Sequence, residues 1–162
     1  MGGTLFAILI PLGLWFLSRT VDRWLGLPGF ADSWVRYLLA VPIGAVGLLF
    51  VLWSNLFLVT RGKGGPAEGF GVAFSPRTEH LVVTGPYRWS RNPMVFGALT
   101  CYTALSLFWG TIGGLLVIAV FIPFAILYIR RSEETRLTRD FGKEYVAYKK
   151  RVSMLVPWPK RK

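Results

Sequence analysis

The chain has 162 residues, and its 19 Lys and Arg against eight Asp and Glu give a formal net charge of +11. It is also 53% hydrophobic, with a mean hydropathy of +0.48, whereas soluble basic proteins such as nucleic-acid binders usually combine their charge with low hydropathy. A single Cys excludes an internal disulfide, and one Cys with one His cannot form a structural zinc site. We therefore expect no metal and no nucleic-acid partner.

The apolar residues are gathered into four uncharged runs, at 4–17, 37–60, 94–109 and 111–129. The second run has 24 residues, enough for a membrane-spanning helix of about 20 residues. The first and third runs are short and span a bilayer only if their ends extend into the polar flanks. The last two meet at Trp109 and Gly110, which predicts a tight helical hairpin. The expected fold is an all-α polytopic membrane bundle of about four transmembrane helices, with a C-terminal amphipathic cytoplasmic helix.

The positive residues indicate an orientation. Of the 19, five lie in the loop at 61–93 and eleven in the tail at 130–162, against three in the loop at 18–36. Four spans place the long loop and the tail on the same face, which the positive-inside rule assigns to the cytoplasm. Both termini are then cytoplasmic. No Lys or Arg precedes the first run, so a secretory signal peptide is not expected. The membrane predicted from this pattern and the small size is a prokaryotic inner membrane.

The same pattern predicts one integral-membrane domain over 1–162. Within it, 1–60 holds the first two spans, 61–93 a cytoplasmic cofactor loop, 94–129 the helical hairpin, and 130–162 a basic amphipathic helix and tail. The glycine-rich stretch at 61–66 lacks the spacing of a phosphate-binding P-loop. No strand, Gly-x-Gly-x-x-Gly turn and helix follow in order, so a nucleotide-binding fold is excluded and the bundle itself must hold any cofactor.

The loop at 80–94 carries the densest group of informative residues. Pro93 suits the first turn of a helix, and Asn92 before it is a candidate N-cap. Arg91 is then placed at a helix N-terminus, a position that favours anionic groups such as a carboxylate. The alternative is that Arg88 and Arg91 are ordinary charged side chains that extend from the membrane interface towards water.

The tail shows a helical stripe with spacings of three and four residues, formed by Glu134, Leu137, Phe141, Tyr145, Tyr148 and Val152. The other faces are basic, so the helix is expected to lie on anionic lipid. Two adjacent carboxylates, Glu133 and Glu134, are poor lipid ligands at the end of a span and need a cationic partner. Arg91 or a cationic cofactor is the candidate, and a purely structural ion pair is the alternative.

Together the loop and the tail resemble the isoprenylcysteine carboxyl methyltransferase and phospholipid N-methyltransferase superfamily of integral-membrane methyltransferases. The family pattern Gly-x-Tyr-x-x-x-Arg-His-Pro-x-Tyr-x-Gly is matched from Gly85 through Tyr87, Arg91 and Pro93 to Gly97. The second element contains Glu133, Glu134 and Leu137, then Phe141-Gly142-x-Glu144-Tyr145-x-x-Tyr148, then Val152 and Pro157. The resemblance covers 81–157, almost half of the chain.

The resemblance implies methyl transfer from S-adenosyl-L-methionine to a lipophilic acceptor that enters from the bilayer. It places the adenine near Leu81 and Val82, and lines the cofactor site with Gly85, Tyr87, Arg91, Asn92 and Pro93. Glu133 or Glu134 would hold the cationic or hydroxyl-bearing end of the cofactor. Arg91 and Glu134 are the expected catalytic residues, with Arg91 on the cofactor carboxylate and Glu134 the candidate proton acceptor if the acceptor is an amine.

Two positions depart from the family pattern. Asn92 stands where many members have His, and an amide cannot titrate near neutrality, so it cannot be a general base. Val95 stands where Tyr is common, which leaves the acceptor open among a carboxylate, an amine and a thiol. Two other functions remain open from the sequence alone: an NADPH-dependent membrane reductase of related bundle fold, and a non-catalytic membrane protein.

Overall fold

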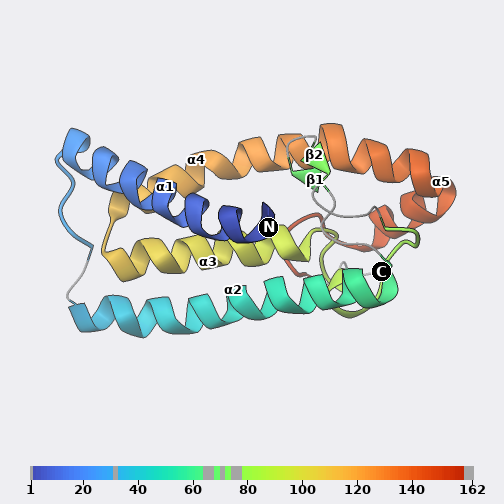
Figure 1. Cartoon of the computed structure of the whole chain (residues 1–162), viewed down its shortest axis with the longest axis horizontal. Coiled ribbons are helices and arrows are strands. Elements are labelled where there is room, and N and C mark those ends of the chain that lie inside the picture. Colours follow the sequence, from blue (N-terminus) through green and yellow to red (C-terminus); the bar gives the residue numbers. More distant parts are fainter. Residues whose placement is uncertain (1, 31–32, 64–67, 70–71, 74–77, 159–162) are drawn as a thin grey trace. The chain divides into compact units, whose positions relative to one another are not determined.

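The computed structural model describes residues 2–30, 33–63, 68–69, 72–73 and 78–158. Helices α1 (Gly2–Leu25) and α2 (Ser33–Arg61) come first, followed by two short antiparallel strands, β1 (Glu68–Gly69) and β2 (Val72–Ala73), and a 3-10 turn at Gly85–Arg88. Helices α3 (Pro93–Trp109) and α4 (Ile112–Tyr128), a π-helical turn at Ile129–Glu133 and helix α5 (Glu134–Arg151) complete the order (Figure 1). The all-α prediction is confirmed.

Two helical stretches among the described residues are long and apolar enough to cross a membrane, Trp34–Arg61 and Ile112–Arg151. Helix α3 is a shorter apolar helix. The predicted number of four spans therefore stays a prediction. The predicted orientation also counts Arg77 and the basic residues at 160–162, and these lie outside the described residues, as does part of the glycine-rich stretch at 61–66.

Helices α1, α2 and α3 are longer than the uncharged runs that predicted them, whereas α4 is two residues shorter than its run at 111–129. Helix α1 continues past Leu17 to Leu25, and polar side chains in this extension bond to the helix's own backbone. The hydroxyls of Ser18 and Thr20 donate to the carbonyls of Leu14 and Phe16, one turn earlier. Helix α3 begins at Pro93, as expected for a proline in a first helical turn.

The described residues form two compact units, and the first comprises Met1–Leu48 and Ala98–Ile126. Its α3–α4 hairpin turns at Gly110, whose φ of +68° suits glycine. The carbonyl of Gly110 accepts a hydrogen bond from the Phe30 N–H at 3.0 Å. A side chain at Gly110 would also meet Arg36, since an added Cβ would lie 2.5 Å from its Nη1 atom. The positive φ is what requires glycine at this turn, since the flexible Arg36 side chain could move aside.

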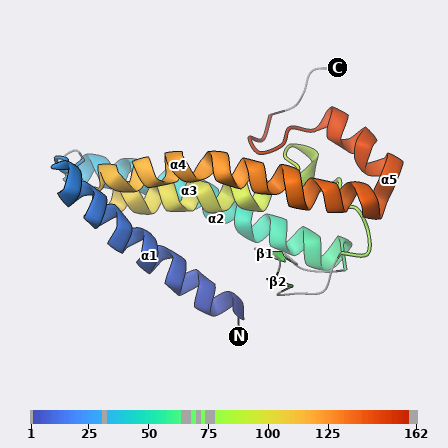
Figure 2. The same cartoon turned by 90° about the horizontal axis from the view of Figure 1, so that it is seen from above.

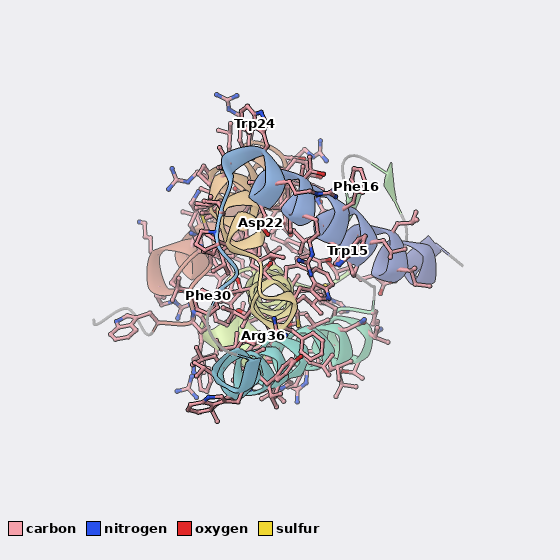
Figure 3. The ribbon with its side chains drawn as sticks, turned by 90° about the vertical axis from the view of Figure 1, so that its left-hand side faces the viewer. Trp15, Phe16, Asp22, Trp24, Phe30 and Arg36 are labelled. Atoms are coloured by element: carbon pink, nitrogen blue, oxygen red, sulfur yellow. The ribbon has the colours of Figure 1, made fainter. Side chains whose placement is uncertain are left out.

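Asp22 fixes α1 against the start of α4 within this first unit. Its Oδ1 atom accepts the Gly113 N–H at 2.6 Å, so a carboxylate caps the positive end of α4. Gly113 permits this approach, because a Cβ there would lie 2.6 Å from the carbonyl oxygen of Ser18. Figure 3 shows Asp22 over the start of α4, whereas Trp24 of the same helix projects outward and is 83% exposed. An interfacial Trp of this kind is common in membrane proteins.

The second unit comprises Leu49–Gly97 and Leu127–Lys162. Its core is formed by Tyr145, Tyr148 and Val152, with Leu81, Leu137 and Phe141 packed against them. Helix α5 contains a kink that the helical stripe in the sequence did not indicate. Gly142 has φ +50° and ψ −124°, values that break the helix, and the chain after it turns back (Figure 2). The reversal brings the second half of α5 over the loop that precedes α3.

Candidate functional site

A cavity in the second unit lies between the loop before α3 and the first turns of α5. The C-terminal end of α2 and the loop contribute Leu58, Thr78, His80, Leu81, Val82, Tyr87 and Arg91. The other wall comes from the π-helical turn and α5, with Glu133, Arg136, Leu137, Phe141, Tyr145 and Tyr148. The sequence stripe on α5 and the loop motif therefore face the same space.

A buried network of three charges adjoins this cavity. Arg91 forms an ion pair with Oε1 of Glu134, and the two side chains are 7% and 5% exposed. Lys149, from the returning half of α5, lies 2.5 Å from Oε2 of the same carboxylate and is 46% exposed. Both oxygens of Glu134 are thus occupied by cations. A buried carboxylate needs such partners, because an isolated charge in a protein interior is strongly unfavourable.

The two adjacent carboxylates Glu133 and Glu134, where the π-helical turn at Ile129–Glu133 meets α5, project in different directions, as successive residues on a helix do. A π-helical turn contains more residues than an α-helical turn and so rotates the residues that follow it. Ile129 at its start is buried, with 2% of its surface exposed. Glu133 lines the cavity, whereas Glu134 turns to Arg91 and Lys149.

Two buried polar groups stand together in the cavity lining, the guanidinium of Arg91 and the hydroxyl of Tyr145, and they interact with each other. Buried polar groups in folded proteins are nearly always satisfied, and these two can satisfy each other or a bound ligand. Burial raises the pKa of Tyr145 to about 12, with a further rise from Glu134 and a partial offset from Arg91. The phenol is therefore neutral at physiological pH and can donate or accept a hydrogen bond.

The other two tyrosines of the cavity are joined to each other through the backbone. The hydroxyl of Tyr148 donates to the carbonyl of Tyr87 at 2.6 Å. Burial raises the pKa of both phenols, so both remain protonated near neutral pH. Their aromatic faces supply apolar and weakly negative surface to the cavity.

The predicted site residues divide into two groups in the structure. Those that line the cavity are Leu81, Val82, Tyr87, Arg91 and Glu133. The others, Gly85, Asn92, Pro93 and Glu134, are not among its lining residues. Gly85 has φ +60° and packs on the Phe57 ring, and a Cβ there would lie 2.4 Å from that ring. Asn92 donates from Nδ2 to the carbonyl of Met154 at 2.9 Å.

Sequence reasoning also missed part of the arrangement. Lys149 and Arg136 were grouped with the lipid-facing basic residues, but Lys149 binds Glu134 and Arg136 lines the cavity. The stripe of apolar and aromatic residues on α5 could have predicted the cavity wall from the sequence. The contact between Lys149 and Glu134 could not be predicted in this way, because it depends on the reversal of the chain at Gly142.

Comparison with known proteins identifies the family. The phospholipid methyltransferase family matches residues 35–144. The chain is 32% identical over 107 residues to methanethiol S-methyltransferase of Mycobacterium tuberculosis, covering 66% of this chain and 38% of that protein. It is 29% identical over 121 residues to protein-S-isoprenylcysteine O-methyltransferase of Saccharomyces cerevisiae, covering 68% of this chain and 47% of that protein. The matches thus span less than half the length of either relative, and no solved structure matches. The family match confirms the resemblance seen in the sequence motifs: the chain belongs to the phospholipid methyltransferase family.

Proposed function

We propose that this chain transfers a methyl group from S-adenosyl-L-methionine to a lipophilic acceptor within a membrane. The family and the names of the two relatives support a methyltransferase. One relative is named for a thiol acceptor and the other for a protein isoprenylcysteine. The acceptor class of this chain, a carboxylate, an amine or a thiol, is left for the assay to decide.

The observation that carries the proposal is the chemistry of the cavity. It presents a buried guanidinium at Arg91, a buried phenol at Tyr145 and a carboxylate at Glu133. Such a set suits a ligand that bears both an anionic and a cationic group, as S-adenosyl-L-methionine does. Arg91 would bind the carboxylate, because guanidinium geometry matches a carboxylate. Glu133 and the tyrosine faces would stabilise the positive end.

When bound, the cofactor supplies a methyl group on a sulfonium centre, which has a good leaving group. The remaining work of the protein is alignment and the exclusion of water. Tyr87, Tyr145 and Tyr148 form buried walls that exclude water from the site. We propose that Glu134 contributes by orienting Arg91, since both its oxygens are engaged by cations, and that Glu133 takes the cationic end. Leu81 and Val82 would contact the adenine ring.

We also propose that the basic face of α5 lies on anionic lipid at the cytoplasmic side of a prokaryotic inner membrane. Its exposed cations include Arg139, Lys143, Lys150 and Arg151. Each such residue near an anionic surface contributes roughly 1 kcal/mol of binding free energy. The positive residues of the loop and the tail would then share the cytoplasmic face with both termini.

Titration calorimetry of the purified protein with S-adenosylhomocysteine tests the cofactor site. We expect Arg91→Lys and Glu134→Gln to bind much more weakly than the wild type while keeping their helical circular dichroism. Arg88→Lys makes the same change in the same loop at an exposed position, and it should bind normally. Wild-type affinity in Arg91→Lys and Glu134→Gln would show that the site is wrong.

An assay with isotope-labelled methyl donor and total lipid extract tests the reaction. The labelled product identifies the acceptor by its mass and by whether the label lies in an ester, an ammonium or a thioether. Thermal unfolding in the presence of S-adenosylmethionine or NADPH is the matched comparison. Stabilisation by NADPH alone would instead indicate a reductase, and stabilisation by neither ligand would indicate a non-catalytic protein.

A further inference from the structure

The last turn of α5 and the segment after it are hydrogen-bonded to residues 87–92 of the loop that carries Arg91. We call residues 148–155 the clasp. Ser90 and Ser153 form an isolated parallel bridge, and the Arg91 N–H donates to the Ser153 carbonyl at 2.9 Å. The Ser153 hydroxyl donates to the Trp89 carbonyl at 2.9 Å. Backbone and side-chain bonds thus join the two segments.

The side chains on either side of Arg91 extend this contact. The Ser90 hydroxyl donates to the Leu155 carbonyl at 2.7 Å and accepts the Asn92 N–H at 3.1 Å. Asn92 donates from Nδ2 to the Met154 carbonyl. Ser90 is fully buried and Asn92 is 7% exposed. Buried polar groups of this kind are costly to leave unpaired, so each bond favours one position of the loop.

The clasp also reaches the Arg91 side chain, through a second route. Lys149 lies within the clasp and binds Oε2 of Glu134, the carboxylate that pairs with Arg91. Tyr148, at the start of the clasp, donates to the Tyr87 carbonyl at the other end of the loop. One segment therefore holds the backbone of Arg91 and the acid that orients its guanidinium.

We propose that the clasp sets the position of Arg91 at the cavity, and that Ser90 and Asn92 are positioning residues that act through it. The proposal gives Asn92 a role that needs no proton transfer and no contact with a cofactor. The expected effect of the clasp on ligand affinity rests on the proposed function. The effect of the clasp on the position of the loop does not, and it can be measured without any ligand.

Hydrogen–deuterium exchange of the full-length protein tests the effect on the loop. We expect Ser90→Ala and Asn92→Asp to speed exchange in the peptide that contains Arg91 and Asn92 by about tenfold, since each loses a buried hydrogen bond. Asn92→Asp keeps the shape of the side chain but replaces the donor with an acceptor. Ser132→Ala makes the same change as Ser90→Ala at an exposed serine, and it should leave exchange unchanged.

A variant that lowers the stability of the protein elsewhere shows whether faster exchange at Arg91 comes from a general loss of stability or from loss of the clasp. Asp22→Ala removes the cap on α4 in the other unit and should leave exchange at Arg91 as it is in the wild type. Ser90→Thr, which restores the hydroxyl, should recover most of the slow exchange lost in Ser90→Ala. Wild-type exchange in both Ser90→Ala and Asn92→Asp, or equally fast exchange in Asp22→Ala, would overturn the proposal.

Calorimetry with S-adenosylhomocysteine then tests the consequence for the site. Affinity should fall by about tenfold in Ser90→Ala and Asn92→Asp, in step with the faster exchange. Faster exchange with wild-type affinity would show that the clasp anchors the loop without setting the site, which would overturn the positioning role. If the wild type itself does not bind, the proposed function fails, and exchange at Arg91 still decides whether the clasp holds the loop.

Discussion

Replacing Glu134 with Gln should expose the energetic role of the buried charges. The change leaves Arg91, which is 7% exposed, without its anionic partner. Removal of one member of a buried ion pair costs about 3–5 kcal/mol in the free energy of unfolding. The Gln carbonyl can still accept one hydrogen bond from Arg91, so we expect the lower end, about 3 kcal/mol. Folded domains have about 5–15 kcal/mol of stability, so the variant should remain folded.

Lys149 should contribute much less to this stability. Its side chain is 46% exposed, and ion pairs that reach solvent contribute about 0–1 kcal/mol because water and salt screen them. Lys149→Met should therefore cost less than about 1 kcal/mol, and it serves as the control for Glu134→Gln. The comparison separates the buried pair from its half-exposed neighbour.

The assay is reversible unfolding in detergent, followed by circular dichroism, for the wild type, Glu134→Gln, Arg91→Met and the double variant. Because Arg91→Met removes the stranded charge and keeps an apolar stem, the double variant should be more stable than the sum of the two single changes predicts, by at least about 1 kcal/mol. A cost below about 1 kcal/mol for Glu134→Gln, together with additive effects in the double variant, would refute this account of the pair.

Two further predictions follow from the two units. Asp22→Ala removes the carboxylate that caps the Gly113 N–H and should lower the unfolding free energy by about 1 kcal/mol, the usual cost of a lost helix cap. Thermal unfolding measures this loss, with Asp140→Ala as the control, because the Asp140 side chain is half-exposed beside Arg139. An equal loss of unfolding free energy in the two variants would contradict the capping role. Tyr145 keeps its proton to about pH 12 in the folded protein, whereas an unfolded tyrosine has a pKa of about 10. The unfolded chain therefore loses this proton first, and the stability contributed by Tyr145 is complete below pH 10 and declines from pH 10 to 12. Unfolding measured across this range should show a shallower decline in Tyr145→Phe, and identical slopes would refute the assignment.

The sequence by itself determined the class of fold and both halves of the site. Uncharged runs set the apolar helices, because hydrophobic length decides which segments can leave water. Pro93 predicted the start of α3, since it has no N–H to donate and suits a first helical turn. The motif around Arg91 and the second motif with Glu133 and Glu134 indicated the family by their resemblance to its sequence pattern, and the family match confirmed it.

Only the tertiary structure decided which atoms of those residues face the cavity and which partners the others take. Glu133 faces the cavity and Glu134 pairs with Arg91, an assignment between the two acids that the sequence left open. The positive φ at Gly142 reverses α5, returns Lys149 to Glu134 and brings the clasp to the loop. The hydrogen bonds between the clasp and the loop join residues about 60 positions apart. Periodicity reports only near neighbours along a helix, and for that reason it did not predict them.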